Sequence, residues 1–289
     1  MGIAGLTIIG ESINDSVPST KKLYEANDIE GLKELARTQD AGGASWIDVN
    51  VGLRPPEFMG RMVREIQSVT AKPLSIDTPD FDIAKAGLEA YDPARAGGRL
   101  PILNSVSTMR VRMFDLYQVQ PFMPLLLSSE TEVDGASRPN RTGAENYAAA
   151  KQLLCLAHEH GISNEQCILD PGIAPIGSDT EGITKMVLES LRLMHADPGF
   201  AGAHCSVGLS NFTVMLPMKR ADGSPVKGPL ESAFLTLAVP LGLDFIIGSV
   251  KRNYQLLPAD HPALQCLQDV LQREGYDCLM RVMEFYSQG

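Results

Sequence analysis

The stretch DIEGLKELARTQDAGGASWIDVN (residues 28–50) decides the fold. Its first part predicts a helix: Asp28 can cap the start, apolar residues recur at helical spacing, and the glycines at 42–43 end the run. Its last part opens the short apolar segment WIDVNV (46–51), which predicts a buried strand. Together with LTIIG (6–10), the stretch forms one strand–helix–strand unit of an α/β protein.

The same unit recurs along the chain. The further strand candidates are PLSID (73–77), PILNS (101–105), PFMPLLL (121–127), CILDP (167–171), HCSVGLSN (204–211) and LDFIIG (243–248). Helical patterns lie between them at 57–70, 81–91, 108–118, 142–161, 180–196 and 229–241. Eight strands with crossover helices predict a closed (β/α)8 TIM barrel. We expect a single domain over 1–289, in which 250–289 is a C-terminal helical extension.

An open doubly wound sheet is the alternative. Such a sheet usually carries a glycine-rich phosphate turn after its first strand. Here that turn is GESIN (10–14), and neither GxGxxG nor GxxxxGK[ST] occurs in the chain, so the barrel is favoured. Two polar insertions, RPNRTG (138–143) and KRADGSPVKG (219–228), are expected to be mobile loops.

Composition excludes several classes of function. The 289 residues carry a net charge of −10, which disfavours nucleic acid as the main partner. No apolar run approaches the roughly 18 residues that span a bilayer, and the N-terminus does not resemble a signal peptide. The five cysteines form no CxxC pair, so neither a disulfide framework nor a metal site is expected. We expect a cytoplasmic protein without membrane contact.

Polar side chains stand at the carboxyl ends of six strands, where the active sites of such barrels lie. They are Glu11, Asn14, Asp48, Asn50, Asp77, Asn104, Asp170 and Asn211. Any one of them could simply cap a helix or close an Asx-turn. Capping alone does not readily explain so many Asp, Asn and Glu residues without a Lys or His. The pattern therefore indicates a polar ring that faces one ligand.

The chemistry of this ring suits a neutral heterocycle. Carboxylates and carboxamides together supply acceptors and donors without strong positive charge. A buried carboxylate can form two charge-assisted hydrogen bonds with an N–H–C–NH2 edge. A 2-amino-4-oxopteridine has this edge, whereas a sugar phosphate does not.

Six motifs resemble those of the pterin-binding barrels. They are GESIN (10–14), IDVNVG (47–52), SIDT (75–78), ILNS (102–105), ILDPGIAP (168–175) and GLSN (208–211). They run in the expected order over about residues 6–250, each on its own strand. Within that group the chain resembles the methyltetrahydrofolate:corrinoid protein methyltransferases, which include the second methyltransferases of O-demethylase systems.

The resemblance implies roles for the predicted residues. Asp77, Asn104 and Asp170 would hold the pterin ring, and Asn211 would lie near N5 and the transferred methyl group. Glu11, Asn14, Asp48 and Asn50 would support the floor of the cavity. The resemblance also implies tetrahydrofolate or 5-methyltetrahydrofolate as substrate, a corrinoid carried by a partner protein, and a homodimer.

The reaction itself defines what Asn211 has to do. N5 of methyltetrahydrofolate is a poor leaving group, so methyl transfer to cobalt(I) builds positive charge on N5. The Asn211 amide can present its oxygen to that charge, and the proton then comes from solvent or a hydrogen-bonded relay. The sequence leaves open whether the methyl group moves to or from the folate.

The segment after Asn211 departs from the family pattern. Val214 stands where some relatives have an amide, and Lys219 and Arg220 are candidates for contact with the folate tail or the corrinoid protein, or form a solvated loop. Two other functions therefore stay open: a dihydropteroate synthase-like enzyme and a non-catalytic pterin-binding subunit. Turnover with a corrinoid would distinguish the methyltransferase from both.

Overall fold

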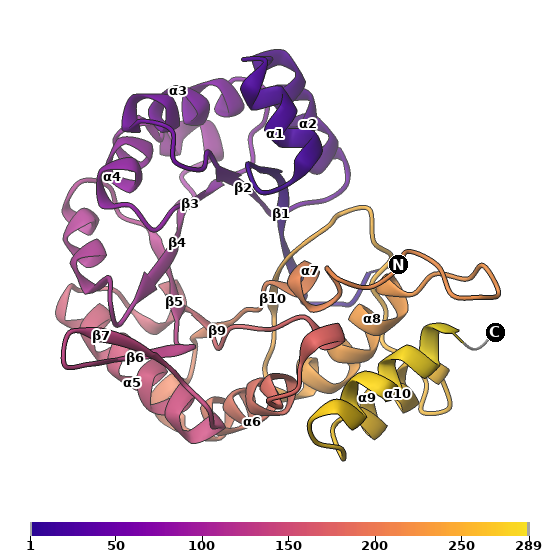
Figure 1. The fold of residues 1–289 in the computed structure, drawn as a ribbon. Coiled ribbons are helices and arrows are strands. Elements are labelled where there is room, and N and C mark those ends of the chain that lie inside the picture. Colours follow the sequence, from indigo (N-terminus) through magenta and orange to yellow (C-terminus); the bar gives the residue numbers. More distant parts are fainter. Residues whose placement is uncertain (1, 288–289) are drawn as a thin grey trace.

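Eight parallel strands form the main sheet of the computed structural model, which describes residues 2–287. They are β1 (Thr7–Asn14), β2 (Trp46–Asn50), β3 (Leu74–Asp77), β4 (Ile102–Ser107), β5 (Met123–Leu127), β8 (Ile168–Asp170), β9 (His204–Cys205) and β10 (Phe245–Gly248). Their order in the sheet is β10-β1-β2-β3-β4-β5-β8-β9. β1 pairs with both β2 and β10, so the first and last strands of the chain are neighbours, and the sheet curls into a ring (Figure 1).

Backbone hydrogen bonds close the ring between β9 and β10. The Asp244 N–H donates to the Cys205 carbonyl at 3.2 Å, and the Ile247 N–H donates to the Val207 carbonyl at 3.0 Å. The first bond lies at the end of the two-residue strand β9 and the second lies two residues beyond it, so the seam is short. The predicted (β/α)8 barrel is confirmed.

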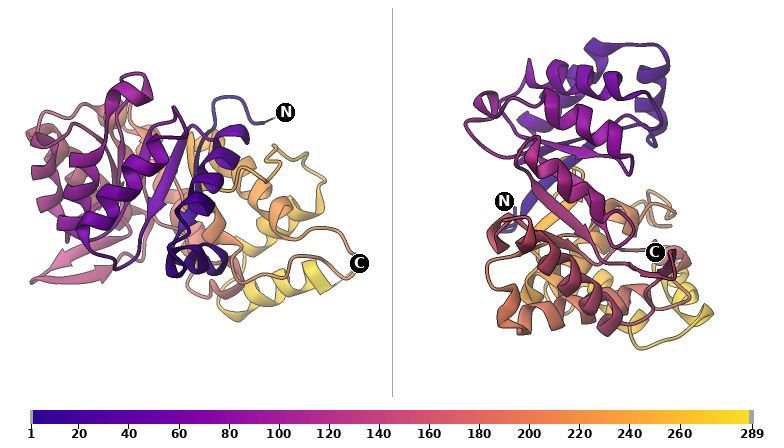
Figure 2. Two further views of the ribbon diagram at one scale, coloured as in Figure 1. Left: turned by 90° about the horizontal axis from the view of Figure 1, so that it is seen from above. Right: turned by 90° about the vertical axis from the view of Figure 1, so that its left-hand side faces the viewer.

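Helices surround the ring on its outer side (Figure 1, Figure 2). The α-helices are α1 (Pro18–Glu25), α2 (Ile29–Ala41), α3 (Pro56–Gln67), α4 (Phe81–Ala90), α5 (Gly143–Glu159), α6 (Ile183–Ala196), α7 (Leu209–Phe212), α8 (Lys227–Ala238), α9 (Pro262–Val270) and α10 (Tyr276–Ser287). Short 3-10 helices are η1 (Pro93–Ala96), η2 (Val111–Gln118), η3 (Asn164–Gln166), η4 (Ile176–Ser178), η5 (Pro198–Phe200) and η6 (Val239–Leu241). Within residues 2–287, no helix has the length and apolar character needed to cross a membrane.

The C-terminal segment after β10 contains the helices α9 and α10. α9 packs against α8, and α10 packs against α9, so both lie outside the ring (Figure 1, Figure 2). The assignment of residues 1–289 to one domain, with 250–289 as its extension, stays a prediction.

The predicted seventh strand over 204–211 is too long. Only His204–Cys205 pairs as a strand, and the chain turns into helix α7 at Leu209. Leu209 and Phe212 are both fully buried, at the i, i+3 spacing of a helical turn. A continuous apolar run does not distinguish a buried strand from a buried helical turn.

The polar insertions are ordered by local contacts. The first half of 138–143 belongs to a hairpin of β6 (Glu130–Val133) and β7 (Ala136–Pro139) whose Asp134-Gly135 turn has positive φ at both residues. This is the Asp-Gly hairpin signal, which the polar character of the segment obscured. The second insertion is attached to α10, because Arg220 Nε donates to the Phe285 carbonyl at 2.8 Å.

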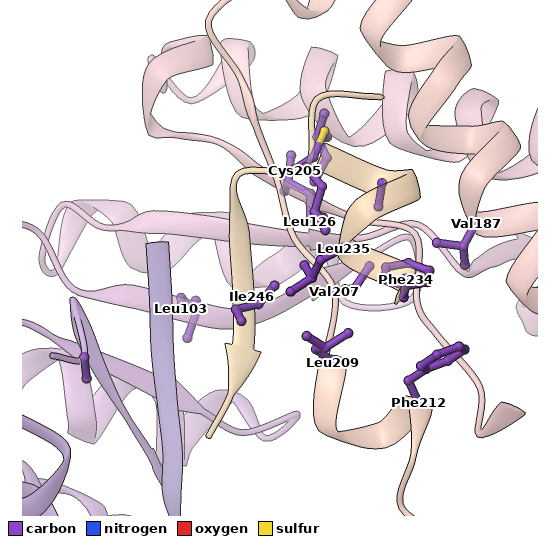
Figure 3. Packing of buried hydrophobic residues seen from close by; sticks show 14 of the residues in the cluster. Leu103, Leu126, Val187, Cys205, Val207, Leu209, Phe212, Phe234, Leu235 and Ile246 are labelled. Carbon is purple, nitrogen blue, oxygen red and sulfur yellow. The ribbon is translucent and has the colours of Figure 1, made fainter. Parts of the chain in front are cut away.

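The hydrophobic core has an inner and an outer part. The inner cluster, inside the ring, comprises Ile9, Ile102, Leu125, Ile168 and Phe245. The outer cluster lies between the strands and the helices, and Figure 3 shows its part around α7 and α8. Because alternate residues of a barrel strand point inward and outward, both clusters draw on the same strands. The inner cluster fills the barrel below the cavity.

Candidate active site

A cavity of about 700 Å³ opens at the carboxyl ends of the strands. Seven of the eight predicted site residues line it: Glu11, Asn14, Asp48, Asp77, Asn104, Asp170 and Asn211. Leu125 and Ile247, at the edge of the inner core, also line the cavity. The structure therefore brings the strand-end residues together around one concave site with an apolar base, a usual form for small-molecule sites.

Asn50, the eighth predicted residue, acts behind the cavity wall. Its Nδ2 donates to Asp77 Oδ2 at 2.9 Å, and its Oδ1 accepts from the Gly52 N–H at 2.8 Å. These two bonds fix the amide and thereby the orientation of Asp77. Asn14 is also bonded locally, because its Oδ1 accepts from the backbone and hydroxyl of Ser16. The supporting role predicted for both residues is compatible with these contacts.

Asp48 and Asp77 form a coupled pair of buried carboxyls. Burial raises the pKa of Asp48 well above its usual value, and the charge of Asp77 raises it further. Burial also raises the pKa of Asp77, while hydrogen bonds from Asn50 and Asp48 oppose that rise. Ser75 donates to Asp48 Oδ1 at 2.6 Å. We infer that Asp48 holds the proton of the pair and leaves Asp77 as the anionic acceptor.

Asp170 is the most isolated acidic group of the cavity. It is 4% exposed, and the Gly172 N–H donates to its Oδ1 at 2.8 Å. Burial raises the pKa of Asp170 to about 7, and the bond from Gly172 opposes this rise. Gly172 has φ of +72°, and a Cβ there would come within 2.7 Å of Ser129. Glycine is therefore required at the turn that presents Asp170.

Helix α7 places Asn211 at the cavity. Leu209 and Phe212 anchor the helix in the core, where the ring of Phe212 lies 5.2 Å from that of Phe234 on α8 (Figure 3). Asn211 lines the cavity from the same short helix. Among the described residues, its side chain forms no hydrogen bond. Its amide can therefore bind a ligand without first breaking an internal contact.

Several cavity residues were not predicted from the sequence as site residues. Among them are Thr213, Lys227, Glu231 and Arg252. Glu231 is 1% exposed on the largely apolar helix α8. A lone carboxylate among apolar helical residues is the signal that could have indicated it, because such groups are rarely buried without a partner. Arg252 provides that partner, with its Nε 3.3 Å from Glu231 Oε2.

The side chains after Asn211 differ in exposure. Val214 lines the cavity and is 56% exposed, and Met215 and Met218 are also exposed. Lys227 Nζ donates to the Val214 carbonyl at 3.1 Å, which ties the start of α8 to this segment. Arg220 is directed to α10, with its guanidinium 4.8 Å from the centre of the Phe285 ring.

The described residues contain no group of three or more His, Cys, Asp or Glu side chains that could hold a metal ion.

Comparison with known proteins identifies the family. The model of the family described as pterin binding enzyme matches residues 13–248, which is most of the chain. The chain belongs to the pterin-binding enzymes. The resemblance inferred from the six motifs is thus confirmed.

Among the relatives of this pterin-binding enzyme is a methylcorrinoid:tetrahydrofolate methyltransferase of Eubacterium limosum. The two sequences are 26% identical over 250 residues, which is 83% of each chain.

Dihydropteroate synthases have a similar structure. The enzyme of Xanthomonas albilineans in complex with 7,8-dihydropteroate is 16% identical, with a TM-score of 0.54 over 92% of each chain. That of Vibrio fischeri ES114 is 14% identical, with a TM-score of 0.60 over 93% of this chain and 94% of the other. These similarities support the fold.

Proposed function

We propose that this pterin-binding enzyme transfers a methyl group between a corrinoid protein and N5 of tetrahydrofolate. The observation that carries the proposal is the pairing of two kinds of group in one cavity. Asp77 and Asp170 offer carboxyls, of which Asp170 is buried, and Asn211 offers an amide without an internal hydrogen bond. The name of the Eubacterium limosum relative supports the same reaction.

The pterin ring is held by Asp77, Asn104 and Asp170 in this proposal. A carboxylate facing the 2-amino group and its neighbouring ring N–H forms two charge-assisted hydrogen bonds. Asn104 can donate and accept at the ring edge, and its Nδ2 lies 3.5 Å from Asp48 Oδ1. The apolar residues Leu125 and Ile247 provide surface against which a flat ring can pack.

Asn211 acts on the charge of N5. Its amide oxygen stabilises the positive charge that N5 carries when the N5–CH3 bond breaks or forms. Pre-oriented groups of this kind lower the barrier because they need no reorganisation during the reaction. The corrinoid is the second substrate, and its cobalt supplies the electron pair that takes up the methyl group.

The corrinoid protein must approach the open side of the cavity. The exposed Val214 and Met215 lie beside Asn211 in the chain, and Val214 lines the cavity. We propose that this segment forms part of the rim on which the corrinoid protein docks. A homodimer and a cytoplasmic location stay predictions, and sedimentation and cell fractionation would test them.

Anaerobic methyl transfer tests the function. The purified protein is mixed with methyltetrahydrofolate and cob(I)alamin, or with methylcobalamin and tetrahydrofolate, and the corrinoid spectrum is followed. Conversion in either direction supports the proposal. Binding of methyltetrahydrofolate without conversion would instead indicate a pterin-binding subunit, and condensation of a pterin pyrophosphate with 4-aminobenzoate would indicate a dihydropteroate synthase.

A further inference from the structure

Glu231 is a buried carboxyl at the cavity that pterin recognition does not use. It is 1% exposed, and its Oε1 accepts a hydrogen bond from Thr213 Oγ1 at 2.5 Å. Its Oε2 accepts no hydrogen bond from the described residues and lies 3.3 Å from Arg252 Nε. A buried carboxylate oxygen without a hydrogen bond is costly. The burial of this oxygen therefore favours the protonated form of the Glu231 carboxyl.

Glu11 is a second carboxyl in the same part of the cavity. It lies on β1, and a hydrogen bond links it to the Ser210 side chain. Burial raises the pKa of Glu11, and the charge of Glu231 raises it further. Burial likewise raises the pKa of Glu231, which the bond from Thr213 and the charge of Arg252 oppose.

Burial and the repulsion between the two carboxyls raise the pKa of the pair, and the charges of two cations oppose this rise. The titratable and charged groups that act on the pair are Asp48, Lys227, Arg252 and Tyr254. The charge of Lys227, whose ammonium also donates to a backbone carbonyl, lowers the pKa of Glu231, whereas burial raises the pKa of Tyr254, so that phenol stays neutral. Arg252 is the cation in direct contact with Glu231. A single proton shared by the pair removes the repulsion between two carboxylates and leaves one negative charge beside these cations.

The chain connects both carboxyls to Asn211. Ser210 and Thr213 stand on either side of Asn211 in the sequence, and the hydroxyl of each contacts one carboxyl. Both residues also line the cavity. A hydroxyl can accept one proton while donating another, so each can pass a proton between its carboxyl and a group in the cavity.

We propose that Glu231 exchanges a proton with N5 of the bound folate through the Thr213 hydroxyl, with Glu11 as the second carboxyl of this proton reservoir. The proposal rests on the methyl transfer proposed above. Glu231 is a positioning residue here, since Thr213 and not Glu231 meets the folate.

The exchange balances in both directions. When tetrahydrofolate accepts the methyl group, the N5 lone pair forms the N–C bond, and the electrons of the broken Co–C bond stay on cobalt. The N5 proton passes to Thr213, whose own proton passes to Glu231. When methyltetrahydrofolate donates, Glu231 returns the proton through Thr213, the electrons of the N5–CH3 bond return to N5, and cobalt(I) electrons form the Co–C bond.

The test compares single-turnover methyl transfer as a function of pH in five proteins. Glu231→Gln and Thr213→Val should slow transfer about 10²-fold and lose the wild-type pH profile, because the relay is broken. Thr213→Ser keeps the hydroxyl and should restore most of the rate and the profile. Thr236→Val is the matched control on α8, where the lost hydroxyl contacts the Ser232 carbonyl and the Leu257 N–H.

The outcomes separate this proposal from the proposed function. Wild-type protein that transfers no methyl group would overturn both. Wild-type transfer together with unchanged pH profiles of Glu231→Gln and Thr213→Val would overturn the relay alone. Glu231→Gln leaves Arg252 without its counter-charge and could prevent folding. In that case the comparison of Thr213→Val with Thr213→Ser tests the relay. Methyltetrahydrofolate affinity near that of wild type in Thr213→Val, with a lost pH profile, would support the relay over loss of the binding site.

Discussion

Asn50 donates a hydrogen bond to Asp77 although it does not itself line the cavity. The contact makes Asn50 a support for pterin recognition. Asn50→Ala should weaken methyltetrahydrofolate binding by about 1 to 2 kcal/mol, because Asp77 loses its orientation. Isothermal titration calorimetry measures this. Asn164→Ala, which removes bonds to the Gly199 and Ala201 carbonyls, should leave the affinity unchanged.

Asp170 and Asp179 are equally buried but should respond oppositely to substitution by Asn. The pKa of Asp170 is about 7 in the folded chain and about 3.9 when unfolded, so the folded state binds more protons between these values. Stability therefore falls as pH rises through this window. Asp170→Asn removes this pH-dependent loss of stability, because asparagine does not ionise. It should stabilise the fold at pH above about 7, by up to about 4 kcal/mol.

Asp179→Asn is the comparison. The Asp179 carboxylate caps α6, accepting from the Ile183 N–H and from the N–H and hydroxyl of Thr184. Loss of one acceptor oxygen should destabilise the fold by about 1 to 2 kcal/mol. Urea denaturation of both variants checks the signs. A destabilised Asp170→Asn would show that Asp170 serves the fold rather than a ligand.

Pterin affinity should depend on pH through Asp170. Its carboxylate accepts N–H donors only when ionised, and the pKa of about 7 means that it becomes protonated below neutral pH. Affinity for methyltetrahydrofolate should therefore fall as pH decreases through about 7, by up to about tenfold per pH unit. Asp170→Asn should bind methyltetrahydrofolate weakly, and its affinity should change little with pH in this range. Equal pH dependence in both proteins would assign the titration elsewhere.

Asn211 should affect methyl transfer more than binding. Asn211→Ala removes the amide that meets the charge on N5, so the single-turnover rate should fall by about 10² to 10³. The dissociation constant of methyltetrahydrofolate should change much less. Asn211→Asp tests the electrostatic role of this side chain. A carboxylate in its place still stabilises positive charge on N5, so the variant should keep more of the rate than Asn211→Ala. Parallel loss of rate and affinity in Asn211→Ala would reduce its role to pterin binding.

The segment after Asn211 should affect methyl transfer only when the corrinoid is bound to its carrier protein. Met215→Glu and Met218→Glu place charges on side chains that are 66% and 64% exposed, and so leave the barrel core intact. Transfer involving the corrinoid protein should weaken by tenfold or more, whereas transfer with free methylcobalamin should stay near wild type. Met280→Glu on α10 is the exposed control. Equal effects on both corrinoids would place the docking surface elsewhere.

The fold could be predicted because each strand and helix has a local signal. Eight apolar runs of strand length alternate with amphipathic stretches, and that alternation specifies a barrel. The exceptions have local causes. Helix α1 begins at Pro18 without a side-chain cap, so the proline alone marks its start. The run after His204 contains a helical turn within an apolar segment.

The site could be predicted only in part because its residues come from two kinds of position. Asp77, Asn104 and Asp170 end strands, and the rule for barrels places such residues at one face. Glu231 and Arg252 reach the cavity from a helix and from the loop after β10. No sequence spacing relates these two residues to the strand ends. Their proximity depends on how α8 packs, which is a property of the folded chain.

The short strand β9 divides the cavity between two parts of the chain. The polar groups assigned to the ring come from residues up to Asp170. Those assigned to the methyl group and the N5 proton come from residues after Cys205, except for Glu11. Replacing the second part alone would keep binding of the heterocycle and change the reaction that it undergoes. The barrel thus offers a natural junction for chimeras, in which one recognition half is combined with different reactive halves.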